Sequence, residues 1–524
     1  MIKRHIFLYG PPGSGKSFVG AQLANQMQCP FVDLDEKIEN RVGTSVADFF
    51  REHTEAEFRQ IEFETLQQAC MQDAGAVIAL GGGALLRADS QTLAEQTGQI
   101  VCLMGASDVL WAHIENEPGK RPLLADDGRL QLETVLNNRA EHYRQFPVIK
   151  VDGLNPNQIT DAIQIQTGRF FVSGMGNGYP VIVRIGSRNQ IGEYLQALGL
   201  QGPVAVVTDQ QVGKFYMDTI KDNLESSGFS TKGIVIPAGE QNKNMETVQV
   251  IWDQMLAAGL ERGSTVLAVG GGVVTDMAGF AAATFLRGVS WVACPTSLLG
   301  MVDASLGGKT GVDLPQGKNL VGAFYPPKMV IVDPEMLATL PDVELKNGMA
   351  EVLKHGIISN TDIVDLCLEM NWKEVVPSMI PTIMVAKISV INADPYEKGS
   401  RATLNLGHTI GHAIELESGF QIRHGEAIGL GMLAESGIAL KLGLCHTELP
   451  NIIFQALHNL GLPTKLSSSI NTDRIINAMQ NDKKKSGEKI KFALPRQIGT
   501  VGYGDQVYEQ LVRDAILELQ KTEH

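Results

Sequence analysis

The sequence predicts an α/β fold with several domains, and three observations support this prediction. The chain has 524 residues, whereas one compact core serves about 150, so three or four units are expected. Short apolar runs alternate with helical stretches up to about residue 333, a pattern typical of parallel sheets covered by helices. Helical windows dominate after that point, which predicts a mainly helical C-terminal domain.

The expected elements follow in chain order. Residues 1–166 form a first strand and helix series, with strands in HIFLYG, CPFVDLD, AVIALGGG and QIVCLMG. Residues 167–178 are glycine-rich and predict a linker or the first edge strand of the next unit. Residues 179–333 form a second series, with strands in PVAVVTD, GIVIPAG, TVLAVGGG, SWVACP and MVIVDP. In the last part, 334–524, helices are expected at 342–368, 379–393, 409–418, 424–442 and 505–520, with a hairpin in KIKFALPRQIGTVGYG.

Composition is that of a folded enzyme and disfavours several other classes. Hydrophobic residues make up 44% and charged residues 19%, and 44 basic against 58 acidic residues give a net charge of -14. This charge disfavours nucleic acid or an anionic membrane as the main partner. Six scattered cysteines without a C-x-x-C pair indicate core thiols in a reducing compartment. No apolar run approaches the roughly 18 residues of a transmembrane helix and no signal peptide is evident, so a cytoplasmic protein is expected.

A phosphate-binding motif lies near the N-terminus. The stretch GPPGSGKS fits the P-loop template G-x-x-x-x-G-K-[ST] at every fixed position, between an apolar run and a helix. Backbone N–H groups would attract phosphates, Lys16 would reach the terminal ones and Ser17 would bind magnesium. The alternative is a glycine turn with a chance lysine. A second Gly-Lys-Thr, in LGGKTG, is not a P-loop, because Asp303 stands where the template requires glycine.

Further polar groups in this half could reach a substrate. Asp33 and Asp35 are expected to end the second strand on one face, so one could serve the metal and the other a substrate hydroxyl; the alternative is a helix N-cap or a solvated turn. The other candidates are weak individually, and a surface arginine or a simple turn is the alternative for each: Arg59, the turn of Gly81 to Gly83, Arg121 in a proline-containing segment suited to a lid, and Arg139.

Together these stretches resemble one family. GPPGSGKS, DLD, EFRQIE, GGG, KRPLL and R-x-x-x-Y fall in the order and spacing of shikimate kinases, which residues 1–166 resemble over their whole length. The resemblance implies a P-loop kinase fold, and shikimate phosphorylation by ATP with Mg²⁺. It assigns shikimate to Asp35, Arg59, Gly82 and Arg139, ATP to Gly13, Ser14, Gly15, Lys16 and the lid residue Arg121, and Mg²⁺ to Ser17 and Asp33. A regulatory module that senses ATP is the alternative.

The second half carries another glycine turn before a helix. In GGGVVTDMAGF, Gly270 to Gly272 end a strand and Asp276 lies near the helix start, which suits a dinucleotide pyrophosphate although it is not G-x-G-x-x-G. Glu240 and Lys243 follow another strand in PAGEQNK, where ribose or phosphate contacts compete with a plain surface turn.

A metal site is the strongest chemical signal of this half. His408 and His412 are four residues apart and share a helix face, and His424 follows; the pattern is not H-E-x-x-H, so a zinc protease is disfavoured. A buried polar pair is the alternative. Glu351 and Lys354 lie one turn apart, with an ordinary surface ion pair as the alternative. Basic residues indicate a small anionic ligand; they lie in the glycine-rich loops FLRG, GGKTG and GKN and in NDKKK. For NDKKK, a solvated lysine face is the alternative.

From about residue 179 the chain closely resembles 3-dehydroquinate synthases. The motifs are GGGVxxDxxGF, PTSLLGMVDASLGGKTG, GKN, AExxK, RxxLNxGHTxGH and HGEA. The resemblance implies a Rossmann-like α/β NAD-binding domain at 179–333 and a mainly helical metal- and substrate-binding domain at 334–524. It implies conversion of 3-deoxy-arabino-heptulosonate 7-phosphate to 3-dehydroquinate with loss of phosphate, NAD being a cofactor that is not consumed, and a homodimer formed through this half.

The same resemblance assigns roles to individual residues. The implied ligands of Zn²⁺ or Co²⁺ are Glu351, His408 and His424. The implied NAD contacts are Glu240, Lys243, Gly272, Val273, Asp276, Thr296, Ser297, Lys309, Lys318 and Thr339. The residues implied to bind the substrate or take part in catalysis are Arg287, Asp303, Lys309, Asn319, Lys354, Lys387, Arg401, Asn405, His412 and Lys483. Two departures from the family pattern are Ser297, where threonine is commoner, and Arg423 before His424. The rival for this half is a metal-dependent polyol dehydrogenase that releases NADH.

Overall fold

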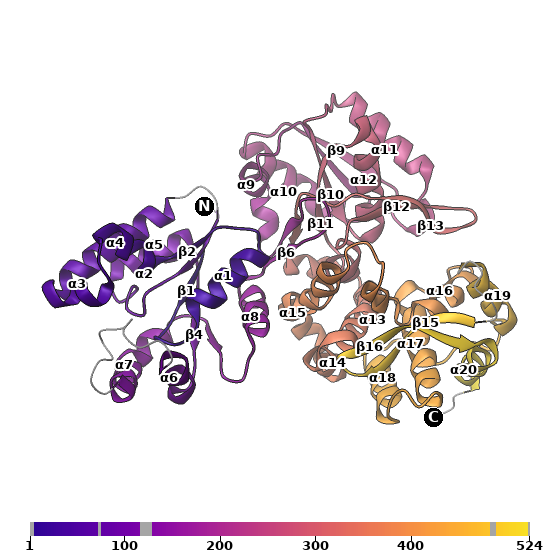
Figure 1. Ribbon diagram of the computed structural model, residues 1–524. Helices are drawn as coiled ribbons and strands as arrows, with labels where there is room; N and C mark the ends of the chain where they lie inside the picture. Colours follow the sequence, from indigo (N-terminus) through magenta and orange to yellow (C-terminus); the bar gives the residue numbers. More distant parts are fainter. Residues whose placement is uncertain (1–4, 72–74, 116–127, 483–488, 522–524) are drawn as a thin grey trace. The chain divides into compact units, whose positions relative to one another are not determined.

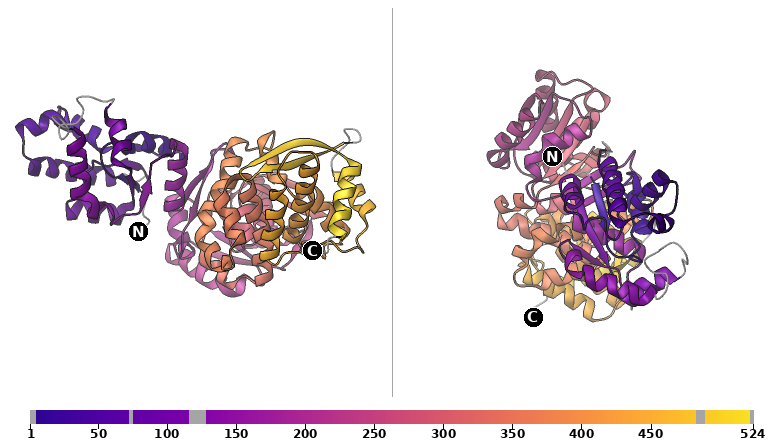
Figure 2. Two further views of the ribbon diagram at one scale, coloured as in Figure 1. Left: turned by 90° about the horizontal axis from the view of Figure 1, so that it is seen from below. Right: turned by 90° about the vertical axis from the view of Figure 1, so that its left-hand side faces the viewer.

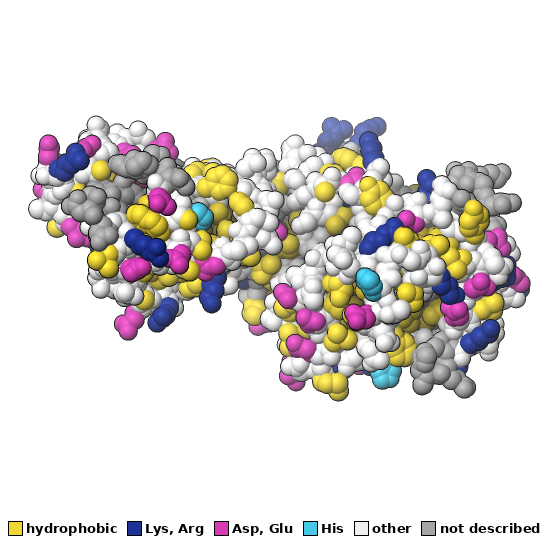
Figure 3. Space-filling view, turned by 60° about the horizontal axis from the view of Figure 1, so that its bottom comes forward, with side chains coloured by type: hydrophobic (Ala, Val, Ile, Leu, Met, Phe, Trp, Pro, Cys, Tyr) yellow, Lys and Arg dark blue, Asp and Glu magenta, His cyan; other side chains and the backbone are white. Residues whose placement is uncertain are grey.

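The computed structural model describes residues 5–71, 75–115, 128–482 and 489–521 (Figure 1). These form two compact units, Met1–Phe171 and Val172–His524. On the face shown in Figure 3, basic and acidic side chains are interspersed rather than separated by sign.

The first unit is a five-stranded parallel sheet with helices on both faces. The strand order is β2-β3-β1-β4-β5. Alternate side chains of β1 point to opposite faces: Ile6 and Leu8 pack with α1 and α8, whereas Phe7 and Tyr9 pack with α2, α4 and α5. The elements are β1 His5–Tyr9, α1 Lys16–Gln26, β2 Phe31–Asp33, α2 Leu34–Val42, α3 Val46–Glu52, α4 Glu55–Cys70, β3 Val77–Ala79, α5 Ala88–Thr97, β4 Gly98–Met104, α6 Ser107–Glu115, α7 Gly128–Tyr143, β5 Val148–Lys150 and α8 Pro156–Thr167.

A seven-stranded sheet follows, in the order β6-β7-β14-β11-β10-β8-β9, whose edge strand β6 spans the boundary between Phe171 and Val172. Strands β8, β10 and β11 are almost fully buried, as expected for central parallel strands. The elements are β6 Arg169–Val172, β7 Tyr179–Val183, η2 Ser187–Gln190, α9 Ile191–Ala197, β8 Val204–Asp209, α10 Gly213–Ser226, β9 Thr231–Ile236, η3 Glu240–Asn242, α11 Met245–Ala257, β10 Thr265–Gly270, α12 Gly272–Thr284, η4 Phe285–Arg287, β11 Ser290–Pro295, η5 Gly300–Ala304, β12 Lys309–Leu314, β13 Gly317–Phe324, β14 Val330–Val332 and η6 Pro334–Thr339.

The rest of this unit is helical, with one antiparallel hairpin. Figure 2 shows the helices, in orange, packed side by side with the yellow hairpin β15–β16 laid across them. The elements are α13 Asp342–Ser359, α14 Thr361–Leu368, α15 Trp372–Ala393, η7 Ser400–Asn405, α16 His408–Glu417, α17 His424–Lys441, α18 Glu448–Asn459, α19 Thr472–Asp482, β15 Lys489–Gln497, β16 Thr500–Tyr508 and α20 Glu509–Lys521.

The segment 167–178 was expected to be a linker or an edge strand, and it supplies the edge strand β6. Other sequence expectations need correction. The run containing GGKTG and GKN was expected as loops, yet it forms the hairpin β12–β13; its glycines at 311 and 322 face each other across the two strands, where a side chain would strike the opposite backbone. The helix expected at 342–368 is two helices, α13 and α14.

Helix α15 corrects the expectation about apolar runs. Among the described residues it is the one helix long and apolar enough to cross a membrane by length and composition. Its side chains at Ile380, Ile383 and Met384 are nevertheless fully buried, and the helix packs on α13 and α14. Because the helix packs on α13 and α14 and 44% of its apolar window is buried, its apolar residues form part of the core of this unit.

The crossing of α16 and α17 depends on glycine at one position. A Cβ on Gly431 would lie 1.9 Å from the carbonyl oxygen of Gly407, whereas a Cβ on Gly437, in the same helix, meets nothing within 4 Å. We expect Gly431→Ala to lower the free energy of unfolding by about 2–3 kcal/mol through overpacking. The matched variant Gly437→Ala should be neutral or slightly stabilising. Denaturant unfolding followed by tryptophan fluorescence checks both, and equal midpoints would contradict the expectation.

Candidate active sites

The P-loop of the first unit joins β1 to α1. Gly15 has a left-handed backbone, with φ +81°, and caps α1. A Cβ on Gly10 would lie 2.2 Å from the carbonyl oxygen of Leu103, so the loop packs tightly against β4. The ammonium of Lys16 donates to the carbonyl oxygens of Gly10 at 2.8 Å and Pro11 at 2.9 Å. The loop thus holds a cation at a helix N-terminus, an arrangement suited to polyphosphate.

The other predicted nucleotide contacts lie in or beside this loop. Gly13 has φ +80°, and Ser14 is buried with its hydroxyl donating to the Pro11 carbonyl at 2.9 Å. Ser17 is exposed in the first turn of α1. Arg121 lies outside the described residues.

The glycine turn after β3 lies beside the P-loop. A Cβ on Gly82 would lie 3.3 Å from the carbonyl oxygen of Gly10. The carbonyl oxygen of Gly82 accepts hydrogen bonds from Arg139 Nη1 at 2.9 Å and from Tyr143 Oη at 2.8 Å. Tyr143 had no signal in the sequence beyond its place four residues after Arg139 in R-x-x-x-Y.

The flanking glycines of this turn contact an acid and an arginine. A Cβ on Gly81 would lie 2.9 Å from Asp35 Oδ1, and one on Gly83 would lie 2.4 Å from Arg59 Nη2. Arg59 forms an ion pair with Glu62 at 2.6 Å; burial raises the pKa of Glu62, and Arg59 opposes this shift. Glu62 was missed from the sequence, although its position three residues after Arg59 on a helix was an available signal.

The two acids in FVDLD were expected to end the second strand on one face, but only Asp33 belongs to that strand. Strand β2 ends at Asp33, whose Oδ1 accepts the backbone N–H of Asp35 at 3.1 Å and of Glu36 at 3.3 Å. Asp33 is therefore the N-cap of α2, and Asp35 lies in the first turn of that helix. The helix begins directly at the strand end, so helical geometry and not strand alternation decides where the two carboxylates point.

In the second unit, polar turns follow the parallel strands β9, β10 and β11 at one edge of the sheet. Gly271 caps α12, which begins with Gly272 and Val273. Thr296, directly after β11, donates its backbone N–H to the carbonyl oxygen of Gly270 at 3.0 Å. Ser297 Oγ accepts the backbone N–H of Gly300 at 3.1 Å. This edge lies where the strand order turns back between β8 and β10, the usual dinucleotide position in such sheets.

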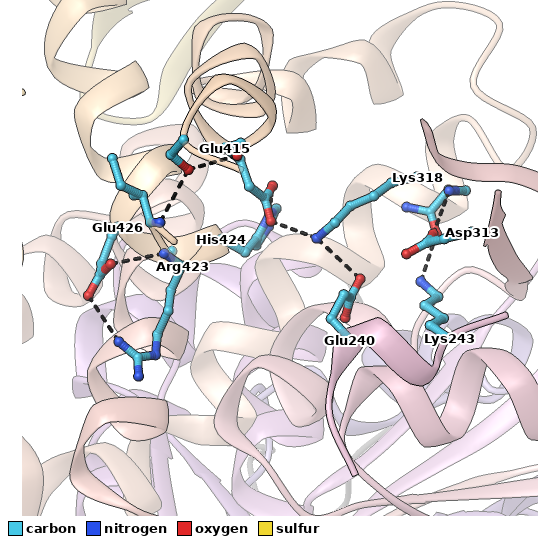
Figure 4. Close-up of polar contacts among 12 residues, drawn as sticks. Glu240, Lys243, Asp313, Lys318, Glu415, Arg423, His424 and Glu426 are labelled. Carbon is cyan, nitrogen blue, oxygen red and sulfur yellow. Dashed lines mark hydrogen bonds and ion pairs between the residues drawn. The ribbon is translucent and has the colours of Figure 1, made fainter. Parts of the chain in front are cut away.

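The hairpin β12–β13 reaches the turn after β9. The buried ammonium of Lys243 pairs with Asp276 Oδ2 at 2.6 Å and donates to Asn319 Oδ1 at 2.7 Å. Lys318 Nζ lies 3.2 Å from Glu240 Oε1 (Figure 4). The structure therefore brings together residues of the turn η3, of α12 and of β13, namely Glu240, Lys243, Asp276, Lys318 and Asn319.

A buried carboxylate and two partly buried imidazoles of the helical part fit a divalent metal ion. Glu351 Oε1 lies 3.4 Å from Nε2 of His408 and 3.4 Å from Nε2 of His424. Donors bound tetrahedrally to zinc at about 2.1 Å are about 3.4 Å apart. Glu351 is fully buried; its Oε2 pairs with Lys354, while its Oε1 has no hydrogen-bond donor among the described contacts. A cation between Oε1 and the two imidazole nitrogens would satisfy this second oxygen.

The other nitrogens of these histidines face acceptors. His408 Nδ1 lies 3.1 Å from the carbonyl oxygen of Leu406, and His424 Nδ1 lies 3.4 Å from Glu415 Oε2. Each Nδ1 can therefore carry the proton and leave the Nε2 lone pair toward Glu351. Burial also holds the pKa of His408 well below its usual value, which favours the neutral ring. The ring of His412 is centred 5.0 Å from that of His408.

Two lysines and a histidine surround Asp303 next to the metal cluster. Lys354 pairs with Glu351 and lies 3.7 Å from Asp303 Oδ1, while Lys387 Nζ lies 2.7 Å from that oxygen. Burial and Lys354 lower the pKa of Lys387 to about 8. His355 Nε2, unforeseen from the sequence, lies 3.3 Å from Asp303 Oδ1. Glu351 and Lys354 are 0% and 1% exposed, so their alternative interpretation as a surface ion pair is wrong.

A third group connects β12 with the segment before α16. Lys309 Nζ lies 2.5 Å from Glu397 Oε2, and Asn405 Nδ2 donates to Glu397 Oε1 at 3.2 Å. Arg401 is buried, and a Cβ on Gly307 would lie 2.2 Å from its Nη2. Glu397 was not foreseen, because nothing in its local sequence distinguishes it from a loop carboxylate.

The remaining predicted residues are placed as follows. Thr339 ends η6 and shares a 2.6 Å hydrogen bond with Tyr216 Oη. Arg287 lies in the turn η4 with φ +69°. Arg423 is exposed and pairs with Glu344 and Glu426, both at 3.7 Å; it faces these acids and not the metal cluster. Lys483 lies outside the described residues.

Comparisons with known proteins identify the families of both units. Family models match residues 12–167 (shikimate kinase), 233–347 (3-dehydroquinate synthase N-terminal) and 348–485 (3-dehydroquinate synthase C-terminal). The curated 3-dehydroquinate synthase of Rippkaea orientalis is 42% identical over 349 residues, which cover 65% of this chain and 95% of the relative.

Two solved structures share the architecture of the second unit. A 2-deoxy-scyllo-inosose synthase complexed with carbaglucose-6-phosphate, NAD⁺ and Co²⁺ matches with a TM-score of 0.60 and 25% identity, covering 67% of this chain and 99% of that one. A 2-epi-5-epi-valiolone synthase from Streptomyces hygroscopicus subsp. jinggangensis 5008, with NAD⁺ and Zn²⁺ bound, matches with a TM-score of 0.60 and 28% identity, covering 65% and 96%. The higher identity to the curated relative and its nearly complete coverage decide between these: the chain belongs to the 3-dehydroquinate synthase family and carries a shikimate kinase domain ahead of it.

Proposed function

We propose that the chain has two separate active sites, one for each activity of these families. The first lies at the P-loop and the glycine turn beside it, and the second lies at the metal cluster and the neighbouring sheet edge. One activity is ATP- and Mg²⁺-dependent phosphorylation of shikimate to shikimate 3-phosphate. The other is NAD- and metal-dependent conversion of 3-deoxy-arabino-heptulosonate 7-phosphate to 3-dehydroquinate with loss of phosphate. Both belong to aromatic amino acid biosynthesis. The observation that carries the second assignment is the buried Glu351 between the Nε2 atoms of His408 and His424.

In the kinase, the P-loop residues Gly13, Ser14, Gly15 and Lys16 would hold the ATP phosphates. Ser17, with Asp33 as a second candidate, would bind Mg²⁺, and Arg121 would close over the phosphates. Phosphoryl transfer requires positioning and charge neutralisation more than covalent help. Asp35 would orient the attacking hydroxyl, and Arg59, Gly82 and Arg139 would hold shikimate, because guanidinium groups match a carboxylate in bidentate geometry. The contacts of Arg59 and Arg139 with one glycine turn support this grouping.

In the synthase, Glu351, His408 and His424 would hold Zn²⁺ or Co²⁺. The bound metal ion would supply polarisation of a substrate hydroxyl, and NAD would supply a hydride acceptor and donor. The chain's own basic residues would grip the phosphate dianion and the carboxylate of the substrate and align its reacting carbons. His412 and Asp303 lie close enough to the cluster to take part in proton movements. The proposed substrate contacts are Arg287, Lys309, Asn319, Lys354, Lys387, Arg401, Asn405, His412 and Lys483.

NAD would lie at the carboxyl edge of the seven-stranded sheet. The N-terminus of α12 would face its pyrophosphate, and the network of Lys243 and Asp276 would border its ribose groups. The proposed contacts are Glu240, Lys243, Gly272, Val273, Asp276, Thr296, Ser297, Lys309, Lys318 and Thr339. The polar turns after β9, β10 and β11 support this position, since they meet at one sheet edge.

We also propose a finer organisation of the chain. The first domain spans 1–166, a linker 167–178, an NAD-binding domain 179–333, and a helical metal- and substrate-binding domain 334–524. The synthase half would form a homodimer. A cytoplasmic location is supported by the six cysteines, which are free in the structure, as expected for a reducing compartment.

One preparation assayed twice tests the two functions. Phosphate release from the heptulosonate phosphate with NAD, and ADP formation with shikimate and ATP, should both be present and both stop after complete chelation. Because the proposed metals differ, adding Mg²⁺ back should restore ADP formation alone, and adding Co²⁺ or Zn²⁺ should restore phosphate release. No net NADH should accumulate. Phosphate release that survives complete metal removal contradicts the metal assignment, and steady NADH release points to a dehydrogenase.

A further inference from the structure

Glu415 on α16 connects the metal cluster with the hairpin β12–β13. The side chain is 4% exposed. Its Oε2 lies 3.4 Å from His424 Nδ1, and its Oε1 lies 2.7 Å from Lys318 Nζ (Figure 4). Each oxygen of this buried carboxylate therefore faces one nitrogen from a different element.

Lys318 extends this connection to the sheet edge. Its ammonium, on β13, also lies 3.2 Å from Glu240 Oε1, and 4.8 Å from the centre of the Phe420 ring. Glu240 belongs to the turn η3 after β9. The ammonium of Lys318 thus bridges Glu415, beside the metal cluster, and Glu240, at the proposed NAD edge of the sheet.

The two histidines of the cluster are oriented by different means. His408 Nδ1 faces the backbone carbonyl of Leu406, whose position is fixed by the chain two residues away. His424 Nδ1 faces only a side chain in the described contacts, that of Glu415. The orientation of the His424 ring therefore depends on where the Glu415 carboxylate is held, and Lys318 holds its other oxygen.

We propose that Glu415 is a positioning residue for the metal ligand His424 and that Lys318 acts on the metal site through Glu415. The carboxylate keeps the proton on Nδ1 and turns the Nε2 lone pair toward Glu351. This inference rests on the proposed metal site of Glu351, His408 and His424. Removing such an outer partner of a ligating histidine typically lowers metal affinity about 10- to 100-fold.

The test measures the affinity of the metal-free full-length protein for Co²⁺ alone, from its visible absorption against a competing chelator. Glu415→Gln keeps the shape of the side chain and removes its charge, and should weaken Co²⁺ binding at least about tenfold and change the absorption spectrum. Lys318→Met should weaken binding by a smaller factor. The double variant should bind like Glu415→Gln alone, because non-additivity reports a shared route.

Two further variants separate the possible failures. Glu417→Gln, on the same helix and paired with Arg474 at 3.4 Å, is the matched control and should bind Co²⁺ within about twofold of the unchanged protein. His408→Ala should abolish binding; if it does not, the proposed metal site and this inference both fail. If Glu415→Gln keeps wild-type Co²⁺ affinity while His408→Ala loses binding, this inference is wrong but the proposed metal site stands. If the effects of Glu415→Gln and Lys318→Met on Co²⁺ affinity are additive, Lys318 does not act through Glu415. If Glu415→Gln also lowers the thermal midpoint of the metal-free protein, the Co²⁺ affinity of Lys318→Met decides, because the side chain of Lys318 is partly exposed. Wild-type affinity of Lys318→Met would then contradict the inference.

Discussion

Replacing His408 with alanine should lower NAD-dependent phosphate release from the heptulosonate phosphate by about a thousandfold or more. Without His408 only Glu351 and His424 remain as ligands, and two donors cannot hold a catalytic divalent ion as three can. Loss of the charge stabilisation that such an ion supplies is worth several kcal/mol, and about 4 kcal/mol corresponds to a factor of about a thousand. The measurement is kcat/KM for phosphate release at saturating NAD, with Co²⁺ content determined on the same sample.

The same variant should leave the kinase unchanged. His408 lies in the second compact unit, whereas the P-loop and its glycine turn lie in the first. Shikimate-dependent ADP formation therefore serves as an internal control for expression and folding. The exposed His446 gives a matched variant, His446→Ala, that should retain both activities. If His408→Ala keeps phosphate release within tenfold of the unchanged protein, the proposed ligand set is wrong.

Replacing Lys16 with methionine should have the reciprocal effect. Lys16 is the one cation whose ammonium is held by the P-loop carbonyls of Gly10 and Pro11 among the described contacts. Removing a preorganised charge that stabilises a transition state costs about 10²- to 10³-fold in kcat. We therefore expect ADP formation with shikimate to fall by that factor, with phosphate release by the synthase unchanged.

The control for this variant is Lys37→Met, at an exposed position on α2. It removes the same charge from the same unit and should leave kcat for ADP formation within about twofold, because surface charges away from the reacting groups contribute little. Equal activity of Lys16→Met and Lys37→Met would contradict the assigned role of the P-loop lysine.

The architecture was largely predictable from local patterns. Apolar runs followed by helical stretches indicated the parallel sheets, since a strand buried on both faces must be apolar throughout. The short strands β5 and β7 and the hairpin β12–β13 were missed. The hairpin is rich in glycine and charge, and its strands form only because the two segments pair with each other, so single-segment patterns carry little signal for it.

Around the metal cluster, sequence spacing identified candidate ligands but not their partners. His408 and His412 share a helix face by spacing alone, but spacing does not say which of them faces Glu351, 57 residues earlier. Glu415, His355 and Glu397 were missed for the same reason. Each is an ordinary residue in its own segment and becomes a partner only through a distant element: Glu415 through α17 and β13, His355 through η5, and Glu397 through β12.

The sequence by itself determined the two families, the P-loop, the glycine turn before α12 and the types of donor available for a metal, because these depend on short stretches whose residues are close along the chain. Only the tertiary structure decided which donors converge. It placed Glu351 between two imidazole nitrogens, buried Lys354, and joined Lys318 to Glu415. These outcomes depend on burial and on distances between elements far apart in sequence, which no local pattern contains.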